Sequence, residues 1–402
     1  PVYIFMSVIV AIFMGLSVSA EEIIKDRKIL KREAFLNLSW SGYLLSKVAV
    51  QLMLSAIQAA TFVIIGNTIM EIKGMYFEYW LVLFSSWAAA NVMGLLISDS
   101  FKTVVTIYIL IPFLVIPQII LSGIIVKFEN LNPKISSPER IPFYGEVITA
   151  RWAYEALATY QFMENDYNSN FYLAEKKKSV AGFKSNYLLK NLQNKINVVI
   201  QNYNNPEDPE IIKNHLALIR NELEKEYSDR MILKTYCEDV PSYKIKNIST
   251  LVPDKLNDSI LAYTEEYIKA LTLAYTEIYR TAFRESNNLK NNFDLEQLQE
   301  LKRNHHNTSL EEFVTNKNEF EKIVEYEGKL IQKTDPIYLD PRSKFIKAHF
   351  YAPRKMLFGH FIPTFWVNVL VIWMMTFGLY ILLYYRILKR TLDFFENFTW
   401  KK

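Results

Sequence analysis

The hydrophobic positions of this 402-residue chain gather in five long runs, four near its start and one near its end. Each run is long enough to cross a bilayer as a helix, which requires about 20 apolar residues. Only the second run contains a charged residue, Lys47, whose ammonium we expect to extend to the membrane interface. The predicted spans are Pro1–Ala20, Gly42–Met70, Tyr79–Ser98, Thr103–Val126 and Phe361–Tyr385.

A polar block separates the fourth span from the fifth. It contains as many Lys and Arg as Asp and Glu, so the formal net charge of +4 arises from the apolar ends of the chain. Helical periodicity recurs along it between prolines, which predicts an inserted helical domain. The predicted helices are Glu210–Tyr227, Asp258–Glu285 and Leu295–Arg303, preceded by an amphipathic helix, Ile148–Met163, expected to lie along the membrane surface.

These patterns predict an all-α polytopic membrane protein with three parts. Residues 1–126 hold four transmembrane helices and a charged loop at 21–41, and residues 361–402 hold the last helix with a basic tail. The cations of the loop and the tail place both on the cytoplasmic side of the cell (inner) membrane. Residues 127–360, of which 127–163 are membrane-proximal, are then periplasmic or extracellular.

Two sequence patterns indicate how the spans pack. Ser86, Ala90 and Gly94 recur every four residues, and such a face of small side chains lets a neighbouring helix approach closely. A polar face on the second span should point into the bundle, because its amides would find no partner in lipid. The residues of this polar face are Gln51, Ser55 and Gln58.

The chemistry-bearing motifs of enzymes are missing from the sequence. A single cysteine, Cys237, excludes an intrachain disulfide, and Cys and His show no zinc-ligand spacing. There is no nucleophile elbow, metalloprotease motif or glycine-rich phosphate loop. No run of like charge suggests a nucleic-acid partner. We therefore expect no catalytic residue and no metal site in this chain.

Three sequence segments stand out by their position relative to the predicted spans. They are VSAEEIIKDRKILKRE from Val18, PQIILSGIIVKFE from Pro117 and ARWAYEALATYQF from Ala150. Together they resemble the membrane domain of ABC-2 type transporters, specifically the subfamily G half-transporters. The resemblance implies a six-helix bundle of which this chain holds the second to the sixth helix. The first helix and the ATP-binding domain would then precede Pro1. The long inserted block without disulfides favours a bacterial protein.

The resemblance also implies how ATP use is coupled to movement of the membrane helices. The charged loop would dock in a nucleotide-binding domain, which binds ATP and Mg²⁺ outside this chain. Charge reversal at Glu33 is then expected to reduce transport while leaving the fold intact. An ordinary positive-inside anchor explains the same charges. The implied coupling residues are Asp26, Arg27, Arg32 and Glu33.

A substrate path along the twofold axis of a homodimer is implied as well. Its apolar wall would suit an amphipathic or lipid-like substrate that is exported. Two bulky residues, Ile124 and Ile125, would form an apolar plug above it. Helix packing alone also explains these residues. The implied cavity residues are Phe13, Met14, Pro112, Ile116 and Ile119.

Two other functions stay open. The chain could be a mechanical device, in which ATP use inside the cell moves the inserted domain so that it acts on a periplasmic partner. It could also be a membrane-anchored scaffold without ATP coupling. All three functions share membrane lipids as partners.

Overall fold

The structure is a computed structural model, and it describes residues 1–32, 39–132, 136–137, 140–203, 209–232, 248, 251–343 and 345–399. The chain divides into two compact units. Pro1–Asn165 and Asp340–Lys402 form the first, which we call the membrane unit, and Asp166–Leu339 form the second, the inserted unit.

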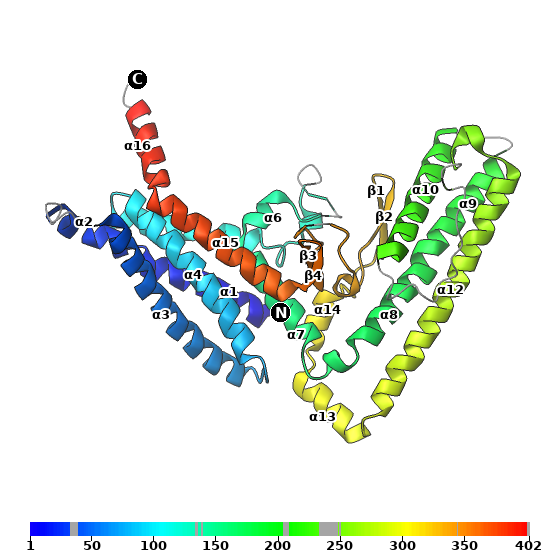
Figure 1. Cartoon of the computed structure of the whole chain (residues 1–402), viewed down its shortest axis with the longest axis horizontal. Helices are drawn as coiled ribbons and strands as arrows, with labels where there is room; N and C mark the ends of the chain where they lie inside the picture. The colour runs from blue at the N-terminus through cyan, green and yellow to red at the C-terminus, as the bar shows by residue number, and fades with distance from the viewer. Residues whose placement is uncertain are drawn as a thin grey trace. The chain divides into compact units, whose positions relative to one another are not determined.

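The membrane unit is a helical bundle with one β-hairpin (Figure 1). The hairpin pairs its two strands antiparallel and leads directly into the last long helix. Its helices are α1 (Val2–Ser19), α2 (Glu22–Arg32), α3 (Trp40–Ile69), α4 (Tyr76–Ser100), α5 (Val104–Ile120), α6 (Phe143–Val147), α7 (Thr149–Met163), α15 (Thr364–Tyr384) and α16 (Ile387–Thr399), and its strands are β3 (Arg354–Leu357) and β4 (His360–Pro363).

Within the described part of the chain, four helices, α1, α3, α4 and α15, are long and apolar enough to cross a membrane, which confirms the length and apolarity of four of the five predicted spans. The prediction for Thr103–Val126 was wrong in its length, because α5 ends at Ile120 after 17 residues. The chain turns there with Gly123 at φ +80°, and a Cβ on Gly123 would collide with the ring of Phe128. The all-α polytopic fold is confirmed, with short hairpins that the sequence had not indicated.

Helices α1 and α4 pack closely, as the row of small residues predicted. A Cβ on Gly15 of α1 would lie 2.8 Å from Cβ of Ala90 and 2.9 Å from the backbone oxygen of Trp87. A Cβ on Gly94 would lie 3.1 Å from the backbone oxygen of Leu16. The missing side chains therefore set the distance between these two helices.

The polar face of α3 also points inward. Gln51 and Ser55 are buried, and Gln58 is half-buried. Asn91 of α4 donates from Nδ2 to Ser55 Oγ at 2.5 Å and to the backbone oxygen of Gln51 at 3.2 Å. A side-chain amide thus joins α3 to α4 inside the apolar bundle.

Helix α7 is more deeply buried than its amphipathic sequence pattern predicted. All its residues except Tyr160 and Met163 are buried, and it packs against α1, α4 and α15. The amphipathic pattern therefore did not reveal that this helix is buried on nearly all sides, and its place at the membrane surface stays a prediction. Its alanines let neighbouring helices approach on sides that the periodicity alone had assigned to water, and its charged residues are paired inside the unit.

The inserted unit is mainly helical, and the three helices predicted there are confirmed as α10, α12 and α13. Buried side chains from α9, α10 and α12, among them Ile196, Leu216 and Ile268, form its apolar core. A π-helical turn, Lys184–Leu188, joins α8 to α9. The elements are α8 (Tyr172–Phe183), α9 (Leu189–Asn202), α10 (Pro209–Ile232), α12 (Asp258–Asn291), α13 (Leu295–His305), α14 (Thr308–Val314) and an antiparallel hairpin of β1 (Ile323–Tyr326) and β2 (Lys329–Gln332).

Candidate functional site

The short charged helix α2 is held on the bundle by the end of α4. The backbone N–H groups of Ile23 and Ile24 donate to Ser98 Oγ at 3.1 and 3.0 Å. The first N–H groups of a helix lack partners within the helix, so Ser98 acts as a cap supplied by another helix. The buried side chain of Ile23 packs in a cluster with Leu44 and Leu95.

Arg27 adds a second set of hydrogen bonds, from a side chain of α2 to the backbone at the end of α4. Its Nη2 donates to the backbone oxygens of Ser98, Asp99 and Phe101 at 3.1, 3.0 and 2.9 Å. The last carbonyls of a helix also lack partners, and a cation is favourable there. Helices α2 and α4 therefore cap each other, and we call this arrangement the α2–α4 clamp, formed by Ile23, Ile24, Arg27 and Ser98.

A second side of α2 faces α3. Lys47 Nζ lies 2.9 Å from Glu22 Oε2 and 2.8 Å from Asp26 Oδ2. The hydroxyl of Tyr43 donates to Asp26 Oδ2 at 3.0 Å. Lys47 thus pairs with two carboxylates of α2, which the sequence-based expectation of a simple interface anchor had not foreseen.

The third side of α2 is exposed. It presents Lys25, Lys28, Ile29 and Arg32, which follow the i, i+3, i+4, i+7 pattern of one helical face. Of the predicted coupling residues, Asp26 and Arg27 point to the bundle, and Arg32 lies on the exposed face. Glu33 lies outside the described residues.

Removing the guanidinium of Arg27 is expected to loosen α2. Arg27→Ala leaves three carbonyls at the end of α4 without their charged donor. A hydrogen bond to a charged group contributes about 1.5–3 kcal/mol to stability. Hydrogen exchange in α2 should accelerate by roughly tenfold or more, because each 1.4 kcal/mol is a factor of ten. Lys28→Ala, on the exposed face, is the matched control and should leave exchange unchanged. Equal protection in both variants would contradict the clamp.

The predicted cavity residues lie on α1 and α5, which contact each other. Phe13, Met14 and Ile116 are 45%, 39% and 50% exposed, Pro112 is exposed, and Ile119 is half-buried. The structure therefore places these five side chains at the surface of the bundle, on two adjacent helices. At the end of α5, Ile124 is half-buried and Ile125 is exposed.

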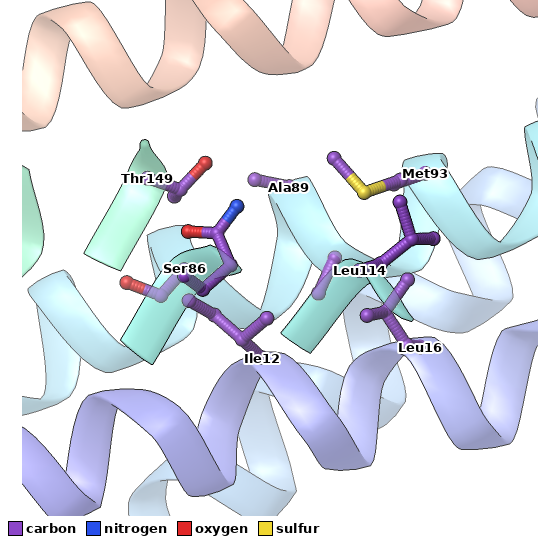
Figure 2. Close-up of a pocket in the computed structure, with 9 residues that line it drawn as sticks. Ile12, Leu16, Ser86, Ala89, Met93, Leu114 and Thr149 are labelled. Atoms are coloured by element: carbon purple, nitrogen blue, oxygen red, sulfur yellow. The ribbon is translucent and has the colours of Figure 1, made fainter. Parts of the chain in front are cut away.

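A pocket inside the bundle is far too small for a substrate. It is lined from four helices, with Ile12 and Leu16 from α1, Ser86, Ala89 and Met93 from α4, Leu114 from α5 and Thr149 from α7 (Figure 2). Its volume is ≈ 10 Å³, which is room for about one water molecule. Gln118 Oε1, beside it, accepts a hydrogen bond from the backbone N–H of Ala150 at 3.0 Å.

Sequence reasoning missed a buried charge cluster at the opposite end of the bundle. Glu155 of α7 accepts at Oε2 from Lys355 Nζ of β3 at 2.6 Å and from Arg151 Nη1 at 3.0 Å. Asn368 of α15 donates to the same oxygen at 2.9 Å and accepts from Lys355 at 2.9 Å. Arg151 also pairs with Glu146. We call these residues the Glu155 cluster.

Burial governs the ionisation of this cluster. For Glu155, burial alone would raise the pKa, but attraction to Lys355 and Arg151 outweighs it and holds the pKa below its usual range. For Lys355, burial and repulsion by Arg151 outweigh the attraction of Glu155 and lower the pKa to about 8. Arg151 and Glu155 are one helical turn apart, but Lys355 lies 200 positions from Glu155, so no local sequence signal could have revealed the whole cluster.

The described residues contain no group of three or more His, Cys, Asp or Glu side chains that could hold a metal ion. The long apolar helices, the clamped charged helix and the exposed apolar side chains of α1 and α5 define a polytopic membrane protein with a charged helix, exposed on one side, at one end of its bundle.

Comparison with known families identifies the membrane part more closely. Residues 1–162 match the family described as ABC-2 type transporter. This part of the chain is thus an ABC-2 type membrane domain, the permease component of an ABC transporter. The family implies that it works in a membrane with an ABC ATP-binding domain. No curated protein and no solved structure matches the chain.

Proposed function

We propose that two copies of this chain form the permease of an ABC exporter of the subfamily G kind, which moves an amphipathic, lipid-like substrate along the dimer axis. The observation that carries this proposal is the exposed apolar wall of α1 and α5, with Phe13, Met14 and Ile116 at the protein surface. Such side chains at the surface require an apolar neighbour. A second copy on the same face would enclose a path lined by both protomers.

The ≈ 10 Å³ pocket supports a path between protomers. A small-molecule site needs a volume of about 300–1,000 Å³, so the substrate does not pass through this pocket. Ile124 and Ile125 follow the turn at Gly123 beyond the end of α5, and the same residues of two protomers could meet as a plug. Apolar side chains there would exclude water until the protomers separate.

The exposed face of α2 is the proposed contact with the ATP-binding domain, where ATP and Mg²⁺ bind. Lys25, Lys28 and Arg32 give it positive charge, and Ile29, which is 45% exposed, gives it an apolar centre. The α2–α4 clamp and the Lys47 pairs make α2 a firm attachment to α3 and α4. A push on α2 by a closing ATP-binding domain would therefore move the spans. Asp26 and Arg27 hold the helix, while Arg32 meets the partner.

Charge reversal at Arg32 tests this coupling. Arg32→Glu should weaken association with the ATP-binding domain and reduce ATP-driven transport of a fluorescent phospholipid in vesicles by roughly tenfold, because like charge at an interface rim repels. Thermal stability should stay unchanged, since the side chain is exposed. Lys190→Glu, a charge reversal at an exposed position of α9 in the inserted unit, is the matched control. Full transport by the Arg32→Glu variant would overturn the assigned contact.

A mechanical function is the second candidate, and the Glu155 cluster favours it. The inserted unit joins the membrane unit at two places, after Asn165 and before Asp340. The first connection continues α7, which carries Glu155, and the second leads to β3, which carries Lys355. Both are tied to α15 through Asn368. We propose residues 127–360 to be periplasmic, so a periplasmic protein that binds the inserted unit and changes ATPase activity would support this candidate.

A further inference from the structure

The last helix, α16, is amphipathic and begins after a sharp break. Arg386, at φ +52°, interrupts the helical course between α15 and α16. At 100° per residue, Ile387, Phe394 and Phe395 share one arc of α16, and Lys389, Arg390, Asp393 and Glu396 occupy the opposite arc.

The polar arc and one edge of α16 are fixed to the bundle. Lys102 Nζ, at the turn between α4 and α5, lies 2.6 Å from Glu396 Oε2. Lys389 Nζ lies 3.8 Å from Oδ1 of the buried Asp99. Leu388 packs against the apolar cluster that contains Ile23. These contacts, on Leu388, Lys389 and Glu396, determine which side of α16 faces away from the bundle.

The side that faces away is apolar. Ile387, Phe394 and Phe395 are 42%, 65% and 60% exposed. They follow directly from the exposed apolar residues at the end of α15, among them Ile381 and Tyr385. Because α15 is long and apolar enough to span a membrane, its exposed apolar residues suit contact with lipid, and the strip on α16 comes directly after them in the chain.

We propose that α16 lies in the bilayer interface as a lipid-binding helix. Ile387, Phe394 and Phe395 enter the acyl-chain boundary of the leaflet on the α2 side. Arg390, on the polar arc, reaches the phosphates of the headgroups. An amphipathic helix with aromatic residues on one face and cations on the other binds this region of a bilayer. The partner is the lipid surface itself, and the inference does not depend on transport.

Depth-dependent fluorescence quenching tests the proposal on the full chain. Cys237→Ser removes the single cysteine, and cysteines placed one at a time at Phe395, Asp393 and Phe377 carry a bimane label. The protein is reconstituted in phosphatidylcholine–phosphatidylglycerol vesicles with lipids spin-labelled on the upper part of the acyl chain. The label at Phe395 should be quenched about twofold or more beyond that at Asp393 on the polar arc. Phe377, within α15, is the reference for lipid contact and for correct insertion.

Quenching by iodide from the aqueous side gives the complementary measurement. Iodide in the buffer should quench the label at Asp393 and spare that at Phe395. If iodide quenches both alike while Phe377 stays lipid-quenched, the helix extends into water and the proposal is overturned. Protection of Phe395 from both quenchers would show that protein covers the strip, which also overturns it.

Discussion

Replacing Glu155 by glutamine is expected to destabilise the membrane unit by about 3–5 kcal/mol, the cost of breaking a buried ion pair from one side. The carboxylate is fully buried, and it is the shared partner of two buried cations, Arg151 and Lys355. Glutamine keeps the shape but removes the charge. Arg151 retains Glu146, whereas Lys355 keeps a hydrogen bond to the neutral Asn368 and its place over the ring of Trp152.

The charge balance of the Glu155 cluster predicts an asymmetry between its two central residues. Lys355→Met removes one cation and leaves Glu155 paired with Arg151 and bonded to Asn368. Its cost should be about 1–3 kcal/mol, that of leaving hydrogen-bonding partners unpaired. The double variant should be more stable than Glu155→Gln alone, because it no longer buries an uncompensated lysine.

Thermal unfolding in detergent measures this double-mutant cycle. A loss of 1 kcal/mol lowers the Tm of a unit of this size by about 2–4 °C, so the Glu155→Gln variant should differ clearly from Lys355→Met. Lys269→Met, whose ammonium pairs with Glu265 at an exposed position, is a matched control and should change little. Equal losses at Glu155 and Lys355, or strict additivity, would show that the cluster does not act as one charge network.

Enlarging Gly15 is the second change with a large expected effect. The Cβ of Gly15→Ala would stand 2.8 Å from Ala90 Cβ and 2.9 Å from the Trp87 backbone oxygen. Since backbone cannot rotate away as a side chain can, α1 and α4 must separate. Overpacking of this kind costs about 1–3 kcal/mol, and Gly15→Val should exceed that range.

The matched control for Gly15 is Gly378 in α15, where a Cβ meets nothing within 4 Å. Gly378→Ala should be neutral or stabilising by about 0.5–1 kcal/mol, because glycine is a poor helix former. Adding Ala90→Gly to Gly15→Ala should recover part of the loss, since one of the two close contacts disappears. Unfolding temperatures that fall equally for Gly15→Ala and Gly378→Ala would contradict the role of close α1–α4 packing.

The sequence was most informative where one local property suffices. Length and apolarity predicted the spans of α1, α3, α4 and α15, and the spacing of Ser86, Ala90 and Gly94 predicted a close helix contact. The same reasoning predicted a span through Val126, although the turn at Gly123 ends α5 earlier. The apolar composition of this segment does not reveal the turn. Glycine adopts φ above zero as readily as φ below zero, so Gly123 can end the helix without any polar residue to mark the place.

The candidate site was predicted only in part. The charged loop was recognised from the order of its residues, and the structure shows that it forms α2. Sequence could not tell that Arg27 turns inward to the end of α4 while Arg32 stays exposed. Partners such as Ser98 lie more than 70 positions away, and which residue caps which helix is decided by packing.

What the sequence by itself determined is the class of the protein: several membrane helices, a polar insertion and a charged loop. These follow from hydrophobic length and local order, which every short segment carries, whereas the ABC-2 type came from the resemblance of three segments to that family. Only the tertiary structure decided the burial of α7, the pairing of Glu155 with Lys355 and the side of α2 left for a partner. A buried charge is tolerated only where opposite charges converge, and convergence of distant residues is a property of the folded chain.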